Sequence, residues 1–310
     1  STLLASSAAS DVYKRQGAYS SRAAEICEYY GLPFINLKFP IDERPSLEQI
    51  EQILKENQDI ALVYITHNET GTGILNPIRE IGALAHAYGA IFVVDTTSTY
   101  AMRPINIKND NIDFCMASAQ KGLMAMTGIS FVVGKRTIIE QSKTYPKRSY
   151  YCNLYMQYHY FEAHGEMHFT PPVQTVYAMR QAIKEYFAEG EQKKWERHTR
   201  VFEALHKGIE RLGFQDMIKR DWQAGLVVTV KYPDDPNWSF SAIHDYCYKR
   251  GFTIYPGKIN NTETFRLCAL GAIDQSDIET FFEVFEAGLR EMEVSLPVHY
   301  GLEEETDERE

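Results

Sequence analysis

The sequence predicts an α/β protein with a doubly wound, mostly parallel sheet and a smaller α+β domain at its carboxyl end. Two observations support this fold class. Nearly continuous apolar runs alternate with amphipathic stretches as far as Val133, a pattern typical of strands buried on both faces and covered by helices. After Thr170-Pro171-Pro172, two long amphipathic stretches follow, and short strands then alternate with helices up to an acidic end.

The elements of the larger domain can be assigned in order. Ala23–Tyr30 is predicted as a short helix that ends at Gly31. Ser46 can cap a helix over Leu47–Lys55, because a serine oxygen accepts a hydrogen bond from the free N–H groups of a first turn. Pro77 and Gly89 bound another helix. The predicted strands are residues 33–39, 60–66, 91–94, 113–117 and 129–133.

The carboxyl-terminal part is predicted as a compact α+β domain. Gly190 separates two long helices, 174–189 and 192–211, and the apolar residues of the second have the spacing of a core-facing stripe. The further elements are strands at 225–230, 252–255 and 264–268 and helices at 240–250 and 274–291. The expected domains are therefore 17–190 and 191–295, followed by an acidic tail at 296–310.

Composition narrows the possible partners of the chain. A formal net charge of -10 over 310 residues argues against nucleic acid. No apolar run reaches the roughly 18 residues that a membrane-spanning helix needs. The five cysteines are scattered, odd in number and never in C-x-x-C spacing, which indicates reduced thiols rather than disulfides or a zinc site. We therefore expect a cytoplasmic protein that acts on small molecules, without a metal.

A lysine and an aspartate follow two of the predicted strands. Asp95 comes directly after strand 91–94, and Lys121 comes shortly after strand 113–117. Ligands of doubly wound sheets bind beyond the carboxyl ends of the strands. An amine and a carboxylate placed there suit pyridoxal phosphate, because the lysine can form a Schiff base with the aldehyde and the aspartate can pair with the pyridine nitrogen. Either residue alone would be read as a loop lysine or a turn cap.

Further motifs extend this pattern over most of the chain. They are Gly17-Ala18-Tyr19, His67-Asn68-Glu69-Thr70-Gly71-Thr72-Gly73, Val94-Asp95, Ser118-Ala119-Gln120-Lys121, His168-Phe169-Thr170-Pro171-Pro172, Tyr255-Pro256-Gly257-Lys258 and Thr264-Phe265-Arg266. With these motifs in this order, the chain from Gly17 to about Met292 resembles the class V aminotransferases of fold type I. Within that class it is most similar to the 2-aminoethylphosphonate–pyruvate transaminases. The resemblance implies pyridoxal phosphate as cofactor, an amino donor and a 2-oxo acid as substrates, and a homodimer.

The resemblance also implies cofactor-binding roles for five side chains. Lys121 is the Schiff-base lysine and the proton shuttle, and Asp95 pairs with the pyridine nitrogen. Tyr19 stacks on the pyridoxal ring, Thr70 lies near its phenolic oxygen, and Gln120 contacts the phosphate. Ordinary structural roles stay open for two of these residues, because Tyr19 could be a core residue and Thr70 a turn hydroxyl.

Three further residues are expected to serve the substrate or the neighbouring subunit. Thr170 resembles the threonine that one subunit lends to the cofactor phosphate of the other. Arg266 resembles the arginine that grips the substrate anion, since a planar guanidinium matches a carboxylate or phosphonate through two bonds; a salt bridge at a strand edge is its alternative. We also expect Arg148 to be a second cation that binds a phosphonate, although no family motif supports this role. His67 is equally compatible with a structural and a functional role.

The sequence also departs from the family pattern. Lys121 is followed by Gly122-Leu123-Met124, where close relatives often carry a cysteine and, further on, Val-Pro-Gly. Residues 1–16 are expected to be a non-native leader, because Asp11-Val12-Tyr13-Lys14-Arg15-Gln16 resembles the translated end of a transposon sequence used to prepare sequencing libraries. The family's amino-terminal segment, with the loop that cradles the cofactor phosphate, is not found in the chain. We therefore expect weakened cofactor binding.

Several alternative functions remain open from sequence alone. The first is another class V reaction, such as alanine–glyoxylate or serine–pyruvate transamination. The second is a catalytically impaired fragment that keeps the fold. A cysteine desulfurase is less favoured, because no cysteine lies in an obvious catalytic loop, and a Rossmann oxidoreductase lacks the G-x-G-x-x-G turn after a strand.

Overall fold

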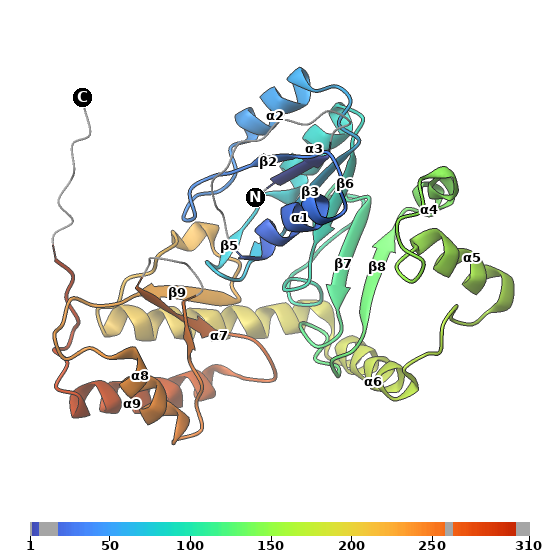
Figure 1. The fold of residues 1–310 in the computed structure, drawn as a ribbon. Helices are drawn as coiled ribbons and strands as arrows, with labels where there is room; N and C mark the ends of the chain where they lie inside the picture. Colours follow the sequence, from blue (N-terminus) through green and yellow to red (C-terminus); the bar gives the residue numbers. More distant parts are fainter. Residues whose placement is uncertain (1, 6–17, 258–262, 302–310) are drawn as a thin grey trace, which may run out of the picture. The chain divides into compact units, whose positions relative to one another are not determined.

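The computed structural model describes residues 2–5, 18–257 and 263–301, which form two compact units (Figure 1). The first unit contains the described residues up to Trp195, except Ile41–Glu43 and Glu69–Leu75. Those two short segments belong to the second unit, together with the chain from Glu196 onwards. Each unit has its own hydrophobic core and is described by itself. The domain limits predicted from sequence, 17–190 and 191–295, stay a prediction.

A six-stranded mixed sheet forms the centre of the first unit. Its strand order is β2-β1-β3-β6-β7-β8, with β3, β6 and β7 parallel, β1 antiparallel to both its neighbours and β8 antiparallel to β7. The bounds are β1 Thr2–Ala5, β2 Ile35–Leu37, β3 Leu62–Thr66, β6 Ile91–Asp95, β7 Phe114–Ser118 and β8 Ser130–Gly134. The predicted α/β class is confirmed. β1 lies within the segment that we expect to be a non-native leader, and the origin of that segment stays a prediction.

The first unit also contains helices, and the residues at the start of α2 explain where that helix begins. The Ser46 hydroxyl accepts a hydrogen bond from the Gln49 amide at 3.2 Å, so the predicted cap of α2 is confirmed. Ile50 and Leu54 of that helix are buried in the core of this unit. The helices are α1 Ala18–Tyr29, α2 Leu47–Glu56, α3 Ile78–Ala87, α4 Arg136–Gln141, η1 Ser142–Thr144, α5 Leu154–His164, α6 Val173–Glu189 and the start of α7 Glu191–Arg211.

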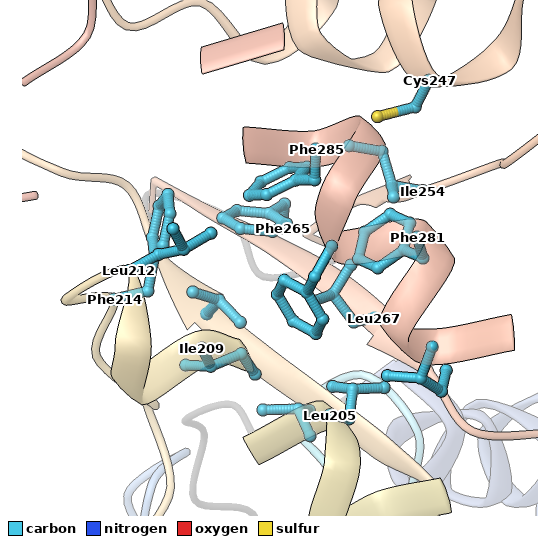
Figure 2. Close-up of a cluster of buried hydrophobic side chains, with 14 of the residues drawn as sticks. Leu205, Ile209, Leu212, Phe214, Cys247, Ile254, Phe265, Leu267, Phe281 and Phe285 are labelled. Atoms are coloured by element: carbon cyan, nitrogen blue, oxygen red, sulfur yellow. The ribbon is translucent and has the colours of Figure 1, made fainter. Parts of the chain in front are cut away.

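The second unit packs its helices on a three-stranded antiparallel sheet of order β10-β11-β9. Figure 2 shows its core, in which Leu205 and Ile209 of α7 lie near Phe265 of β11 and Phe281 and Phe285 of α9. The predicted core stripe of α7 is thus confirmed. The bounds are β4 Asn68–Glu69, β5 Ile74–Leu75, η2 Arg220–Trp222, β9 Val227–Lys231, α8 Phe240–Tyr248, β10 Tyr255–Pro256, β11 Thr264–Cys268 and α9 Gln275–Glu291.

Two general features bear on the sequence-based expectations. None of the five cysteines, all of which lie within the described residues, forms a disulfide. Among the described residues, no helix combines the length and the apolar character that crossing a membrane requires. The cytoplasmic location stays a prediction.

Candidate functional site

The carboxyl ends of β3, β6 and β7 lie at one edge of the parallel part of the sheet. Strand register pairs Asp95 of β6 with Thr66 of β3 and with Met116 of β7, so the three strands end almost level. Lys121 lies in the turn directly after β7. The structure therefore places the predicted aspartate and lysine at the edge where ligands of such sheets bind.

Asp95 is held with its carboxylate at this edge. Its Oδ1 accepts a hydrogen bond from the Thr97 amide at 2.8 Å, and its Oδ2 accepts a longer one from the Tyr64 hydroxyl at 3.4 Å. The side chain is half-buried. Because an ionised carboxylate is an acceptor with about four lone-pair sites, Asp95 retains capacity for a further N–H donor such as a protonated pyridine nitrogen.

The turn that carries Lys121 has a defined backbone and an exposed amine. The Met124 amide donates to the Lys121 carbonyl at 2.8 Å, and the Ala125 amide donates to the Ala119 carbonyl at 3.0 Å. Within the described residues, the Lys121 Nζ makes no hydrogen bond or ion pair. The neighbouring Gln120 is also exposed. The lysine amine is thus available to a ligand, while the turn beneath it is fixed.

Backbone strain marks the same turn. Met124 has φ 57°, in the left-handed region that side chains other than glycine rarely adopt. Gly122 is equally constrained, because a Cβ there would lie 2.0 Å from the Tyr100 carbonyl oxygen. Such conformations persist only where the surroundings impose them, and they gather at functional sites. The sequence showed the departure from the family at Met124 but gave no sign of its geometry.

A buried polar network lies beneath the edge. The His67 amide donates to the Asp95 carbonyl at 2.8 Å, and its Nδ1 contacts the Thr99 hydroxyl at 2.9 Å. The Asn68 amide group donates to the Ser98 hydroxyl at 3.1 Å. Burial, together with the nearby Arg103, lowers the pKa of His67 to about 3, so its imidazole is neutral. This geometry favours the structural role of His67, which holds the turn after β6 in place.

In the second unit, the structure brings together Thr70 and Arg266. The Arg266 guanidinium is buried and donates from Nη1 to the Thr70 carbonyl at 3.2 Å and from Nε to the Pro256 carbonyl at 3.1 Å. The central carbon of the guanidinium, Cζ, lies 6.0 Å from the centre of the Tyr255 ring. Within the described residues its partners are backbone carbonyls rather than a carboxylate, which speaks against the strand-edge salt bridge. In the part of the chain that the structure describes, its other three N–H groups have no hydrogen-bond partner.

The other residues predicted for the site are Tyr19, Thr170 and Arg148. Tyr19 belongs to α1, but its side chain lies outside the described residues. Thr170 is exposed between α5 and α6. Arg148 is exposed after η1, and its Nη1 lies 3.5 Å from the Tyr30 carbonyl. Within the described part of the chain, no hydrogen bond links Thr170 or Arg148 to Asp95 or Lys121, so that their roles stay predictions.

The donor set at the sheet edge fits pyridoxal phosphate. The cofactor needs an uncharged or exposed amine for its aldehyde and an acceptor for its pyridine nitrogen, and Lys121 and Asp95 offer these groups at the same edge. Gln120, exposed next to the lysine, offers an amide donor of the kind a phosphate accepts.

Comparison with known proteins also indicates an aminotransferase. The model of the family "Aminotransferase class-V" matches residues 12–252. The chain is 34% identical over 283 residues to 2-aminoethylphosphonate–pyruvate transaminase 1 of Cupriavidus pinatubonensis, which covers 91% of this chain and 75% of that protein. It is 32% identical to the bifunctional phosphonoacetaldehyde hydrolase/aminoethylphosphonate transaminase of Clostridioides difficile, over 87% of this chain and 43% of that one.

Solved structures show the same fold. Alanine–glyoxylate aminotransferase from Nostoc sp. superimposes with a TM-score of 0.80 at 23% identity, covering 88% of this chain and 73% of that one. Ureidoglycine–glyoxylate aminotransferase from Bacillus subtilis gives a TM-score of 0.80 at 21% identity, over 90% and 73%. The fold is that of the fold-type I aminotransferases, and the family implies pyridoxal phosphate as cofactor. The chain belongs to the class-V aminotransferases.

Proposed function

We propose that this aminotransferase moves an amino group from 2-aminoethylphosphonate to pyruvate, giving phosphonoacetaldehyde and alanine. The observation that carries the proposal is the buried Arg266, whose orientation is fixed by two backbone carbonyls while its other three N–H groups have no partner among the described residues. The names of relatives at 32–34% identity support the same substrates.

Arg266 suits the anions of both substrates. A guanidinium can donate two parallel bonds to a phosphonate as well as to a carboxylate, so one side chain can hold 2-aminoethylphosphonate in the first half of the reaction and pyruvate in the second. Because Nε and Nη1 are already held by Pro256 and Thr70, little rotamer entropy remains to be lost when an anion binds. Thr70 then contributes through its carbonyl, in addition to the role proposed for its hydroxyl.

Lys121 and Asp95 are proposed to serve the chemistry. When bound, pyridoxal phosphate supplies an electron sink for the carbon that loses or gains a proton. The Lys121 Nζ would hold the cofactor and then move that proton, which its exposed position in a fixed turn permits. Asp95 would keep the pyridine nitrogen protonated through its carboxylate. Gln120, Thr170 and Tyr19 are proposed for the phosphate and the ring, and Arg148 as an additional phosphonate contact.

The amino donor is the decisive test. Each donor is incubated with the chain, pyridoxal phosphate and pyruvate or glyoxylate, and the product amino acid is quantified. We expect 2-aminoethylphosphonate with pyruvate to give the highest kcat/KM. Preference for alanine with glyoxylate, or for serine with pyruvate, would replace the substrate assignment and leave the family unchanged. Unchanged kinetics in Arg148→Ala would remove Arg148 from the site.

We also infer that two copies of the chain pair. Large apolar side chains are exposed in the segment that contains Thr170, among them Tyr150, Tyr151, Phe161 and Tyr177. Exposed apolar groups gathered in one segment mark association surfaces. Sedimentation should therefore give twice the chain mass of 35.6 kDa. A monomer at micromolar concentration would contradict the inference.

A further inference from the structure

A buried lysine that the proposed function does not use contacts the turn carrying Lys121. Lys194, on the first turn of α7, is only 1% exposed. Its Nζ donates to the Gly122 carbonyl at 2.5 Å, and Gly122 directly follows Lys121. Burying an ammonium group is costly unless it is well bonded. The bond to the Gly122 carbonyl offsets part of that cost, and it acts on the backbone next to the candidate catalytic amine.

The surroundings of Lys194 hold its ammonium in place. Its Nζ lies 5.3 Å from the centre of the Tyr186 ring, within the range of a cation–π interaction. Its backbone amide donates to the Gly190 carbonyl at 3.0 Å, as part of the start of α7. An ammonium fixed by its helix and by an aromatic face is a rigid donor rather than a mobile surface charge.

The next residue of α7 contacts the second turn of the site. The Arg103 guanidinium lies 4.4 Å from the centre of the Trp195 ring. Arg103 closes the turn that follows Asp95 and β6. Two consecutive residues, Lys194 and Trp195, thus contact the turns that follow the two strands of the site.

These two turns are also packed directly on each other. A Cβ on Gly122 would lie 2.0 Å from the Tyr100 carbonyl oxygen and 2.6 Å from the Met102 Cγ. There is no room for the Gly122 peptide to shift towards the turn after β6. The Lys194 bond to the Gly122 carbonyl is a second restraint on the same residue.

We propose that Lys194 is a positioning residue for amino transfer. Its ammonium fixes the Gly122 carbonyl, and thereby the direction in which the Lys121 side chain leaves the turn. This inference rests on the role proposed for Lys121. Proton transfer depends steeply on such placement, and a misplacement of about 1 Å can cost about 100-fold in rate.

The test compares Lys194→Met with Lys193→Met. Methionine keeps the length and the apolar contacts of Lys194 but removes its charge and donor, and Lys193 is the exposed neighbour on the same helix. We expect Lys194→Met to lower kcat at least about tenfold with KM within about threefold, because placement rather than binding is lost. Lys193→Met should match the unsubstituted chain.

Amide hydrogen exchange supplies a readout that needs neither cofactor nor activity. The amides of Met124 and Ala125 close the turn through the Lys121 and Ala119 carbonyls. In Lys194→Met we expect these two amides to exchange at least about tenfold faster, while Val93 and Val94 in β6 keep their rates. A purely structural lysine would instead change all of them together with the melting temperature.

The possible results test the positioning role of Lys194 and the catalytic role of Lys121 separately. Equal exchange at Met124 and Ala125 in the Lys194→Met and Lys193→Met variants would overturn the positioning role. Borohydride labelling of the unsubstituted chain tests Lys121 separately, because the exchange experiment is run without cofactor. If Lys194→Met fails to fold, Lys194→Arg is compared with Lys193→Arg. The guanidinium of Lys194→Arg is larger than the ammonium group and must displace the Gly122 carbonyl. We therefore expect faster exchange of the Met124 and Ala125 amides, and unchanged exchange would contradict the proposal.

Discussion

Replacing Arg266 by lysine tests how the site holds its substrate. Lysine keeps the positive charge but offers a single point donor in place of the planar fork. It also cannot keep the bonds that Nε and Nη1 make to the Pro256 and Thr70 carbonyls at 3.1 and 3.2 Å. One charge-assisted hydrogen bond to the substrate anion is worth about 2 kcal/mol, which corresponds to a loss of about 30-fold in kcat/KM.

The assay measures kcat/KM for 2-aminoethylphosphonate and for pyruvate separately. Because one arginine is proposed to hold both anions, both values should fall by a similar factor in Arg266→Lys. Arg290→Lys is the matched control, since Arg290 pairs with Glu286 on the surface of α9 in the same unit. A decrease below about threefold in a variant with an unchanged melting temperature would refute the role of Arg266 in holding the anion.

Three further predictions concern the frame of the site. Gly122→Ala should lower the free energy of unfolding by about 1–3 kcal/mol, since its Cβ would meet the Tyr100 carbonyl at 2.0 Å; a melting temperature equal to that of the unsubstituted chain would contradict this. His67, with a pKa lowered from 6.5 to about 3 by burial and Arg103, binds a proton more readily in the unfolded chain. Stability should therefore fall as pH drops through that window, by at most about 1.4 kcal/mol per pH unit. His67→Gln should flatten this dependence, and an unchanged slope in urea titrations would count against it. Burial opposes ionisation of Asp113, but Lys135, the Phe92 amide and His86 outweigh it and hold its pKa below 3.8. The stability that this carboxylate provides is present above that pH and is lost as pH falls further, so Asp113→Asn should be less stable at neutral pH and show a weaker acid transition. Equal acid transitions in the two proteins would remove Asp113 from the account.

Much of the fold could be predicted from sequence because its signals are local. The apolar run predicted as strand 91–94 became β6, which extends one residue further to Asp95, and Ser46 caps α2 as its position predicts. The helices α4 and α5 were not predicted. Neither buries a residue fully, so neither carries the apolar stripe on which such predictions depend. The strand expected at 252–255 is reduced to Tyr255–Pro256, so residues 252–254 do not join the ladder and Pro256 extends it by one residue.

The candidate site was predictable to the extent that motifs carry it. Asp95 and Lys121 follow strands, and strand ends of a parallel sheet meet at one edge, so their placement follows from order alone. The bond from Arg266 to the Thr70 carbonyl joins residues far apart in the chain and has no local signal. The role of Lys194 could not be predicted for the same reason. A lysine on an amphipathic helix is ordinarily exposed, and only the fold buries this one.

Covalent attachment of the cofactor is the most direct test of the account. The chain is incubated with pyridoxal phosphate, reduced with borohydride, digested and analysed by mass spectrometry, with Lys121→Ala in parallel. We predict a single reduced pyridoxyl group on the peptide that contains Lys121, and none in the variant. Labelling that is spread over exposed lysines, or that persists in Lys121→Ala, would contradict the assignment of Lys121 and with it the proposed site.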